Sequence, residues 1–253
     1  MKIKTNNEKS AIMLLALSIG FISIVAVTAV VLNMNRPDRL THCISPASDF
    51  SQVDFIIDTT DPISDYQAQF LFKSIKSIVE SKDIGTKIGV YSISSKIGGL
   101  SAELFGRCKP KSGSDANIFY ENKIMVESAY NKGFFDIIRD TISEEVEANE
   151  QQRSPIVEAF LDYSKLEHGV SKSRELFVFT DLLQNTKDYS VYKTAAPLKD
   201  YPYSPSFDGT AVKVFLLERK GTLRDRQSTT IVTEWANLIG ATAESLEFEK
   251  VRY

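Results

Sequence analysis

Residues 11–32, AIMLLALSIGFISIVAVTAVVL, form one apolar run without a single charged side chain. As a helix rising about 1.5 Å per residue, this run spans about 33 Å, which is enough to cross the hydrocarbon core of a bilayer. A helix in a protein core normally has a polar stripe, and none is present here. A cleaved signal peptide is the other alternative, but apolar residues continue past Val27-Thr28-Ala29 to Leu32. The run therefore predicts an uncleaved transmembrane helix, preceded by a tail of residues 1–10.

The charges that flank the apolar run predict its orientation. Three basic residues precede the run, and two follow it with an acidic residue between them: Lys2, Lys4 and Lys9, then Arg36, Asp38 and Arg39. Basic residues favour the cytoplasmic side, and the short leading tail carries no domain that must be translocated. We therefore expect a single-pass protein of the inner (cell) membrane of a bacterium, with its carboxyl-terminal domain in the periplasm or outside the cell.

The rest of the chain divides into a linker or arm, residues 33–52, and a domain, residues 53–253. The chain has two cysteines, Cys43 in the arm and Cys108 in the domain. An even cysteine count on an oxidising side of the membrane allows one disulfide, which would tie the arm to the domain. Two unrelated buried thiols are the alternative that the sequence leaves open.

Short apolar runs and helical patterns alternate along the domain. The runs that predict strands are VDFIID at 53–58, KIGVYSIS at 87–94, ELFVFTD at 175–181 and AVKVFLLE at 211–218, with SLEFEKVRY at 245–253 as an edge strand. The helical patterns cover about 64–81, 128–149, 155–166 and 228–240. Such alternation predicts an α/β fold with a central, mostly parallel sheet and helices on both of its faces.

Polar residues stand where two of these strands end. In VDFIIDTTDPIS, Asp58 closes the first strand, and Asp181 closes ELFVFTD. Ligands of parallel α/β sheets bind outside the carboxyl ends of the strands, so both carboxylates belong to that edge. Ser154 precedes Pro155, which is the pattern of an N-cap followed by proline in the first helical turn. We therefore expect three polar segments to meet at this edge.

Together these segments resemble the three loops of a von Willebrand factor type A domain. The matching residues are Asp58-Thr59-Thr60, the stretch from Ser154 to Ala159, and Phe179-Thr180-Asp181. The resemblance covers about residues 53–253, and it implies a Rossmann-like fold with a metal-ion-dependent adhesion site. Each motif is short, and the specificity of the match comes from the order of the three motifs and their positions after strands.

The resemblance implies that Asp58, Thr60, Ser154 and Asp181 hold a metal ion. Mg²⁺ prefers oxygen ligands and keeps several of its waters, so a few carboxylates and hydroxyls with open positions suit it; Mn²⁺ or Ca²⁺ are the alternatives. The sequence departs from the family at Pro62, where the family has a second serine. Proline offers no side-chain ligand, so the site is completed by water, weakened or empty.

A purely structural interpretation of the same residues is also open. Ser64 and Gln67 form a capping box that starts a helix unaided. Thr60 then belongs to an ordinary turn, Ser154 only caps its helix and Asp181 only opens a turn.

The function that the resemblance implies is binding, without catalysis. A metal at the strand ends would leave a coordination position for an acidic residue of a partner protein, in an envelope-associated complex held at the membrane by the apolar helix. A Mg²⁺-dependent hydrolase of the phosphoryl-transfer type is the alternative, but Thr60 stands where such an enzyme has its second acid, and no phosphate-binding loop is present. The net charge of −3 and the lack of a basic cluster argue against nucleic-acid binding.

Overall fold

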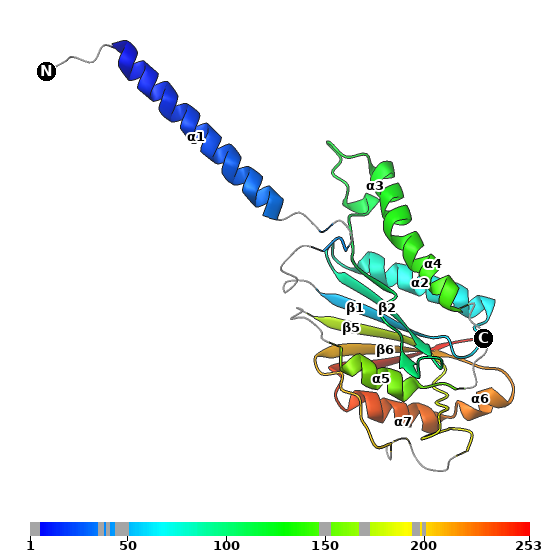
Figure 1. Ribbon diagram of the computed structural model, residues 1–253. Helices are drawn as coiled ribbons and strands as arrows, with labels where there is room; N and C mark the ends of the chain where they lie inside the picture. The colour runs from blue at the N-terminus through cyan, green and yellow to red at the C-terminus, as the bar shows by residue number, and fades with distance from the viewer. Residues whose placement is uncertain are drawn as a thin grey trace. The chain divides into compact units, whose positions relative to one another are not determined.

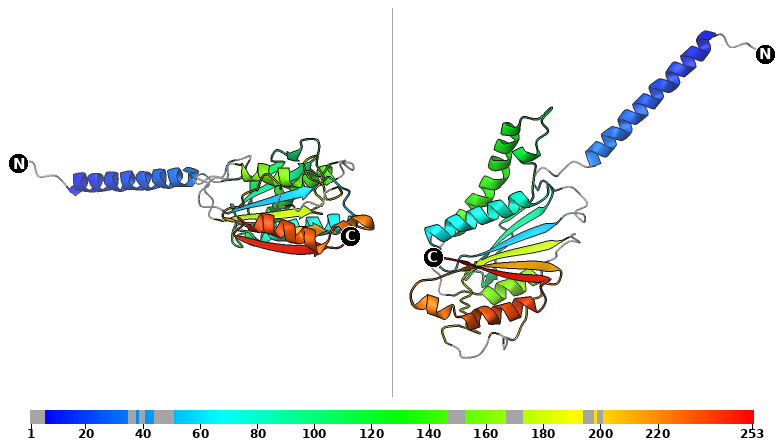
Figure 2. Two further views of the ribbon diagram at one scale, coloured as in Figure 1. Left: turned by 90° about the horizontal axis from the view of Figure 1, so that it is seen from below. Right: turned by 180° about the vertical axis from the view of Figure 1, so that it is seen from behind.

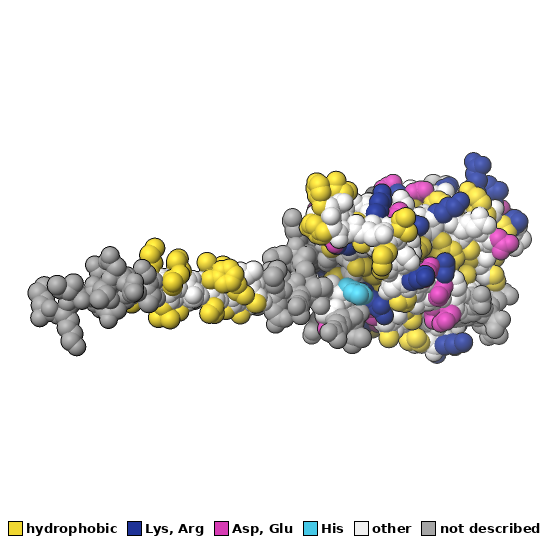
Figure 3. All heavy atoms as spheres, turned by 90° about the horizontal axis from the view of Figure 1, so that it is seen from above, with side chains coloured by type: hydrophobic (Ala, Val, Ile, Leu, Met, Phe, Trp, Pro, Cys, Tyr) yellow, Lys and Arg dark blue, Asp and Glu magenta, His cyan; other side chains and the backbone are white. Residues whose placement is uncertain are grey.

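The computed structural model describes residues 6–34, 38, 41–43, 51–146, 153–166, 173–193, 198 and 201–253. The chain forms two compact units, Met1–Arg39 and Leu40–Tyr253. The first unit contains helix α1 (Asn6–Met34), in which the stretch Ile12–Val30 is long and apolar enough to cross a membrane. Its described side chains are exposed and uncharged (Figure 3). The three hydroxyls of this stretch donate to the carbonyls four residues earlier (Ser18, Ser23 and Thr28), so each of these three donors is paired within the helix.

The second unit is built on a mixed, mostly parallel sheet (Figure 1, Figure 2). Its parallel strands are β1 (Gln52–Asp58), β2 (Lys87–Ser94), β5 (Arg174–Thr180), β6 (Thr210–Leu217) and β7 (Ser245–Val251). Two short strands, β3 (Gly99–Leu100) and β4 (Phe105–Cys108), pair antiparallel with β2. The order is β3-β2-β1-β5-β6-β7 with β4 also on β2. The predicted α/β class is confirmed, and β7 lies at the edge as expected.

Helices cover both faces of the sheet (Figure 1). One face carries α2 (Asp65–Ser81) and α4 (Asp136–Val146), which continues from α3 (Lys123–Tyr130) through a π-helical turn (Asn131–Phe135). The other face carries α5 (Ile156–Ser164) and α7 (Thr229–Gly240), with the short α6 (Thr222–Arg226) before α7. The helix predicted at 128–149 therefore begins earlier, and its last residues lie outside the described part of the chain.

Strand β1 shows why the two layers form. Val53, Phe55 and Ile57 belong to the core under α2 and α4, whereas Ile56 belongs to the core under α5 and α7. Successive side chains of a strand point to opposite faces, so a continuous apolar run buries both of them. The helix after β1 starts as predicted, because Ser64 and Gln67 form the capping box.

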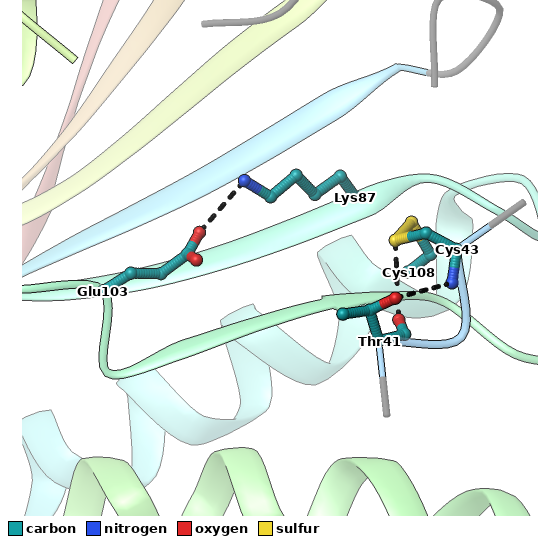
Figure 4. The surroundings of a disulfide bond; sticks show 5 residues. All are labelled: Thr41, Cys43, Lys87, Glu103 and Cys108. Carbon is teal, nitrogen blue, oxygen red and sulfur yellow. Dashed lines mark hydrogen bonds and ion pairs between the residues drawn. A yellow bond between two sulfur atoms is a disulfide. The ribbon is translucent and has the colours of Figure 1, made fainter. Parts of the chain in front are cut away.

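A disulfide ties the segment before the sheet to the domain. Cys43 and Cys108 are bonded across 65 residues (Figure 4). The backbone N–H of Cys108 donates to the carbonyl of Thr41 at 2.7 Å. Cys108 pairs with Lys87, the first residue of β2. The bond therefore lies at the amino-terminal edge of the parallel strands. Closing a loop of this length removes about 4 kcal/mol of chain entropy from the unfolded state.

Asp54 is the polar exception inside β1. Its side chain is fully buried, and Oδ2 accepts hydrogen bonds from the Tyr163 hydroxyl at 2.7 Å and from Nε2 of Gln52 at 2.8 Å. Burial raises the pKa of Asp54 to about 6, although these two hydrogen bonds oppose the shift. Gly89 leaves room for this carboxylate, since a Cβ at that position would lie 2.2 Å from Oδ1.

We predict that Asp54→Asn stabilises the domain at pH 8. The pKa of this group is higher in the folded protein than its ordinary value of 3.8, so stability falls as the pH rises through about 6. A shift of this size corresponds to up to about 3 kcal/mol at pH 8, which asparagine avoids while keeping an acceptor for Tyr163. Denaturation followed by Trp235 fluorescence should show this gain at pH 8 and almost none at pH 4. The exposed Asp140→Asn is the control, and a less stable Asp54→Asn at pH 8 would contradict the prediction.

Candidate functional site

The carboxyl-terminal edge of the sheet brings Asp58 and Asp181 together. Strands β1 and β5 pair in parallel with Ile57 opposite Phe179, so Asp58 and Thr180 end neighbouring strands and Asp181 follows directly. Both aspartates are completely buried. A carboxylate in such a position needs hydrogen-bond or charge partners, which the adjoining loops supply.

Three oxygen atoms from two separate parts of the chain meet beside β1, and we call them the three-oxygen cluster: Asp58 Oδ1, Thr60 Oγ1 and Ser154 Oγ. The Thr60 hydroxyl donates to Asp58 Oδ1 at 2.6 Å, and its oxygen lies 2.9 Å from Ser154 Oγ. The other oxygen of Asp58, Oδ2, accepts from the Thr180 hydroxyl at 2.7 Å. Every one of these side chains is buried. The cluster therefore joins the loop after β1 to the segment before α5, and Thr180 connects it with the end of β5.

Ser154 does not have the expected capping role. The N-cap of helix α5 is Pro155, and the Ser154 side chain makes no capping hydrogen bond to the helix. Instead Ser154 exchanges two backbone hydrogen bonds of 3.0 Å with Asn185, which turns its hydroxyl toward Thr60. The amide oxygen of Gln184 accepts from the N–H of Val157 at 3.0 Å and satisfies a donor of the first helical turn.

Asp181 is engaged by a residue that the sequence analysis missed, Arg219. Asp181 Oδ2 accepts from Nε of Arg219 at 2.7 Å, and Oδ1 accepts from the backbone N–H of Leu183 at 2.9 Å. The Arg219 side chain is only 4% exposed. Of the four predicted metal ligands, three thus form the three-oxygen cluster, whereas the fourth pairs with a buried guanidinium.

The position of Arg219 follows from the end of a third parallel strand. It lies two residues beyond β6, at the same edge as Asp58 and Asp181, and this placement after a strand was the only signal in the sequence. Its Nη1 donates to the carbonyl of Pro62, and its Nη2 lies 4.0 Å from Asp61 Oδ2. Among the described residues, Nη2 has no hydrogen-bond partner. The guanidinium therefore keeps one donor for a further acceptor.

Crowded negative charge perturbs the acids of this edge. Burial and the neighbouring Asp181 carboxylate raise the pKa of Asp58 to about 6, against hydrogen bonds from Thr60 and Thr180. Burial and Asp181 also raise the pKa of Asp61 to about 7, although Arg219 opposes the shift. Burial disfavours the charge of Arg219, but the surrounding carboxylates outweigh it and raise its pKa. A further positive charge at this edge would relieve the repulsion.

The three-oxygen cluster fits a small divalent cation in chemistry and spacing. Adjacent ligands of an octahedral ion at about 2.1 Å are separated by about 3 Å, and the neighbouring oxygens here are 2.6 and 2.9 Å apart. Within the described residues, no group of three or more histidines, cysteines or acidic residues is arranged to hold a metal. A cation would therefore depend on the hydroxyls of Thr60 and Ser154. Asp181 is already paired, and Pro62 offers only a carbonyl that Arg219 occupies.

A cavity of about 420 Å³ adjoins this edge at the ends of β1 and β2. Thr59, Ser92, Ser94, Lys96 and Glu145 are among its lining residues. Ser92 donates to Glu145 at 2.8 Å. Lys96 is the basic side chain of the lining. Thr59, which lies between Asp58 and Thr60 in the sequence, is the lining residue that connects the cavity with the loop after β1.

Comparison with known proteins gives similarities of fold. No protein-family model matches the chain, and no curated protein matches it in sequence. Solved structures that resemble it include an aerotolerance-related membrane protein from Bacteroides fragilis with multiple mutations to serines, at 14% identity and a TM-score of 0.38, covering 79% of this chain and 91% of that chain. The human COPII-coat protein Sec24c is 12% identical with a TM-score of 0.41, over 80% of this chain and 29% of that chain. These similarities say nothing of the residues of the site.

We predict that Arg219→Met destabilises the domain by about 3–5 kcal/mol, because it leaves the buried charge of Asp181 without its partner. Denaturation at pH 8 measures the effect. Adding Asp181→Asn should recover much of the loss, since asparagine carries no charge and can still accept from Leu183. The control is Glu247→Gln, since Glu247 is exposed where it pairs with the partly buried Lys213, and this change should cost less than about 1 kcal/mol. Equal costs for Arg219→Met and Glu247→Gln would refute a stabilising role for the ion pair.

Proposed function

We propose that this chain is a membrane-anchored binding module of the von Willebrand factor type A kind, which captures a partner protein at the carboxyl-terminal edge of its sheet. The observation that carries the proposal is the meeting of Asp58 and Thr60 with Ser154, which lies 94 residues beyond Thr60, in one hydrogen-bonded cluster. A cluster built only to cap a helix would not need the Ser154 hydroxyl to turn away from α5.

A divalent cation, Mg²⁺ in the first place and Mn²⁺ or Ca²⁺ as alternatives, would be held by Asp58, Thr60 and Ser154. When bound, it supplies positive charge and an open position for a carboxylate of the partner. Asp181 contributes negative charge nearby, and the pKa shifts of Asp58 and Asp61 support a site that favours added positive charge. The cavity lined by Thr59 and Lys96 would receive the side chain that carries the carboxylate.

A second candidate is capture of the same acidic partner without metal. It is favoured by Arg219, whose buried guanidinium already offsets Asp181 and keeps Nη2 as a donor. A hydrolase has weaker support, because Thr60 stands where a phosphoryl-transfer enzyme would need its second acid.

The anchor in this proposal is α1, which holds the module at the inner membrane by a single span. The basic residues that precede the span support a cytoplasmic amino terminus and a domain in the periplasm or at the cell exterior. A disulfide between Cys43 and Cys108 is consistent with an oxidising compartment. The function would then be to hold a partner in an envelope-associated complex.

We predict that Mg²⁺, Mn²⁺ or Ca²⁺ raises the melting temperature of the full chain in detergent. An ion at 100 times its dissociation constant stabilises the folded state by about 2.7 kcal/mol, which corresponds to about 5–10 °C for a domain of this size. Thr60→Val should abolish the shift, because it removes a hydroxyl from the three-oxygen cluster. Thr86→Val is the matched control, since Thr86 is equally buried but precedes β2 at the opposite edge. An absence of any shift with all three ions in the wild type would exclude the metal.

We further predict that partner capture by the membrane-bound chain is lost on chelation. The chain is purified from membranes in Mg²⁺ or in EDTA, and the proteins that accompany it are compared, with Asp58→Asn as the variant that weakens the site. Capture that persists in EDTA and in Asp58→Asn, but not in Arg219→Gln, would favour the metal-independent candidate. If EDTA, Asp58→Asn and Arg219→Gln all leave partner capture unchanged, the partner does not bind at the carboxyl-terminal edge of the sheet.

A further inference from the structure

Five large apolar side chains are exposed together at one projection of the domain, which we call the apolar tip. They are Ile118, Phe119, Tyr120, Ile124 and Met125, with exposed fractions of 86, 88, 79, 80 and 69%. They occupy the turn before α3 and the first turn of α3, which project beyond α2 and the sheet (Figure 1). Apolar groups of this size gathered within eight residues mark an interaction site on a soluble surface.

The apolar tip is held in shape by polar contacts at its base. The carboxylate of Glu121 accepts from the backbone N–H of Asn117 at 2.6 Å and from Lys111 at 2.9 Å. Asn122 caps α3 by accepting from the first N–H groups of the helix. The exposed side chains are thus presented by a structured turn, which lowers the entropic cost of binding.

The apolar tip lies on the side of the domain that carries the disulfide. It follows β4, which ends at Cys108 beside the first residue of β2, and the N–H of Lys109 donates to the carbonyl of Thr86 just before that strand. At the other end of the same helical run, Glu145 of α4 contacts Ser92 near the end of β2. The run from α3 to α4 therefore starts at the amino-terminal edge of the sheet and finishes at the carboxyl-terminal edge.

The covalent connection limits what can meet the apolar tip. Helix α1 ends at Met34, and Cys43, bonded to Cys108, is nine residues further along the chain. Nine residues span at most about 32 Å when fully extended. Chain length alone thus limits the distance between Cys43, at the amino-terminal edge of the domain, and the end of α1, the helix that would cross the membrane.

We propose that the apolar tip inserts into the surface of the lipid bilayer that α1 spans. This inference rests on the proposed anchoring by α1. A protruding turn rich in aromatic and aliphatic side chains suits the interfacial region of a bilayer, where Phe and Tyr are accommodated and no complementary groove is needed. The tether keeps the effective concentration of lipid at the tip high, so each insertion needs little affinity of its own.

The test uses the full chain in vesicles of phosphatidylcholine and phosphatidylglycerol, with tryptophan as the reporter and brominated lipids as quenchers. Phe119→Trp should be quenched by more than about half, because an inserted indole lies at the level of the headgroups and upper chains. Tyr66→Trp, an exposed aromatic position at the opposite edge in α2, should not be quenched. The native Trp235 is buried, so the wild type supplies the background.

A third variant, Phe21→Trp in α1, separates the two proposals. Quenching at Phe21→Trp without quenching at Phe119→Trp would overturn the membrane-inserting tip and leave the anchor in place. Loss of quenching at both positions would overturn the anchor itself. The introduced tryptophan of Phe119→Trp could instead become shielded from solvent only at two or more chains per vesicle, without quenching by brominated lipid. That result would assign the tip to a second copy of the chain and overturn the lipid assignment.

Discussion

The complete burial of Asp58 is the constraint on which the carboxyl-terminal edge depends. A carboxylate with no access to water needs every oxygen satisfied, and the partners here come from Thr60 and from Thr180 at the end of β5. Thr60 in turn fixes Ser154, so one strand end organises three loops. Because β1 is central and both of its faces are packed, Asp58 has no freedom to turn outward. The edge is therefore preorganised by the fold before any ligand arrives.

The sequence predicted the layers of this fold well and its polar details poorly. Apolar runs bounded by turn residues located β1, β2, β5, β6 and the edge strand β7, since burial on both faces leaves a strong pattern. The short β3 and β4 carry too few residues to show one. The roles of Arg219 and Asp54 are not predictable from local sequence, because their partners, Asp181 and Tyr163, are far along the chain. Only the folded structure brings each pair into contact. The serine-proline pattern predicts a cap at Ser154 because that pattern is local, whereas the bridge from Ser154 to Asn185 joins residues 31 positions apart.

Arg219 changes the electrostatic interpretation of the edge. Three acids, Asp58, Asp61 and Asp181, lie near a single guanidinium, so one fixed cation only partly offsets their charge. The arrangement holds a residual negative potential next to the three-oxygen cluster and a positive group beside Asp61. Burial makes the interactions among these charged groups stronger than they would be on an open surface.

The disulfide also determines how mechanical load passes through the molecule. A force applied from the amino-terminal side of Thr41 would reach the domain through the disulfide at Cys108, at the end of β4, before it could act on Gln52. The first strand is then spared the peeling force that a direct pull on Gln52 would apply to its ladders with β2 and β5. A force applied at the carboxyl-terminal edge of the sheet would instead act along the strands. In this shear geometry many hydrogen bonds resist the force together.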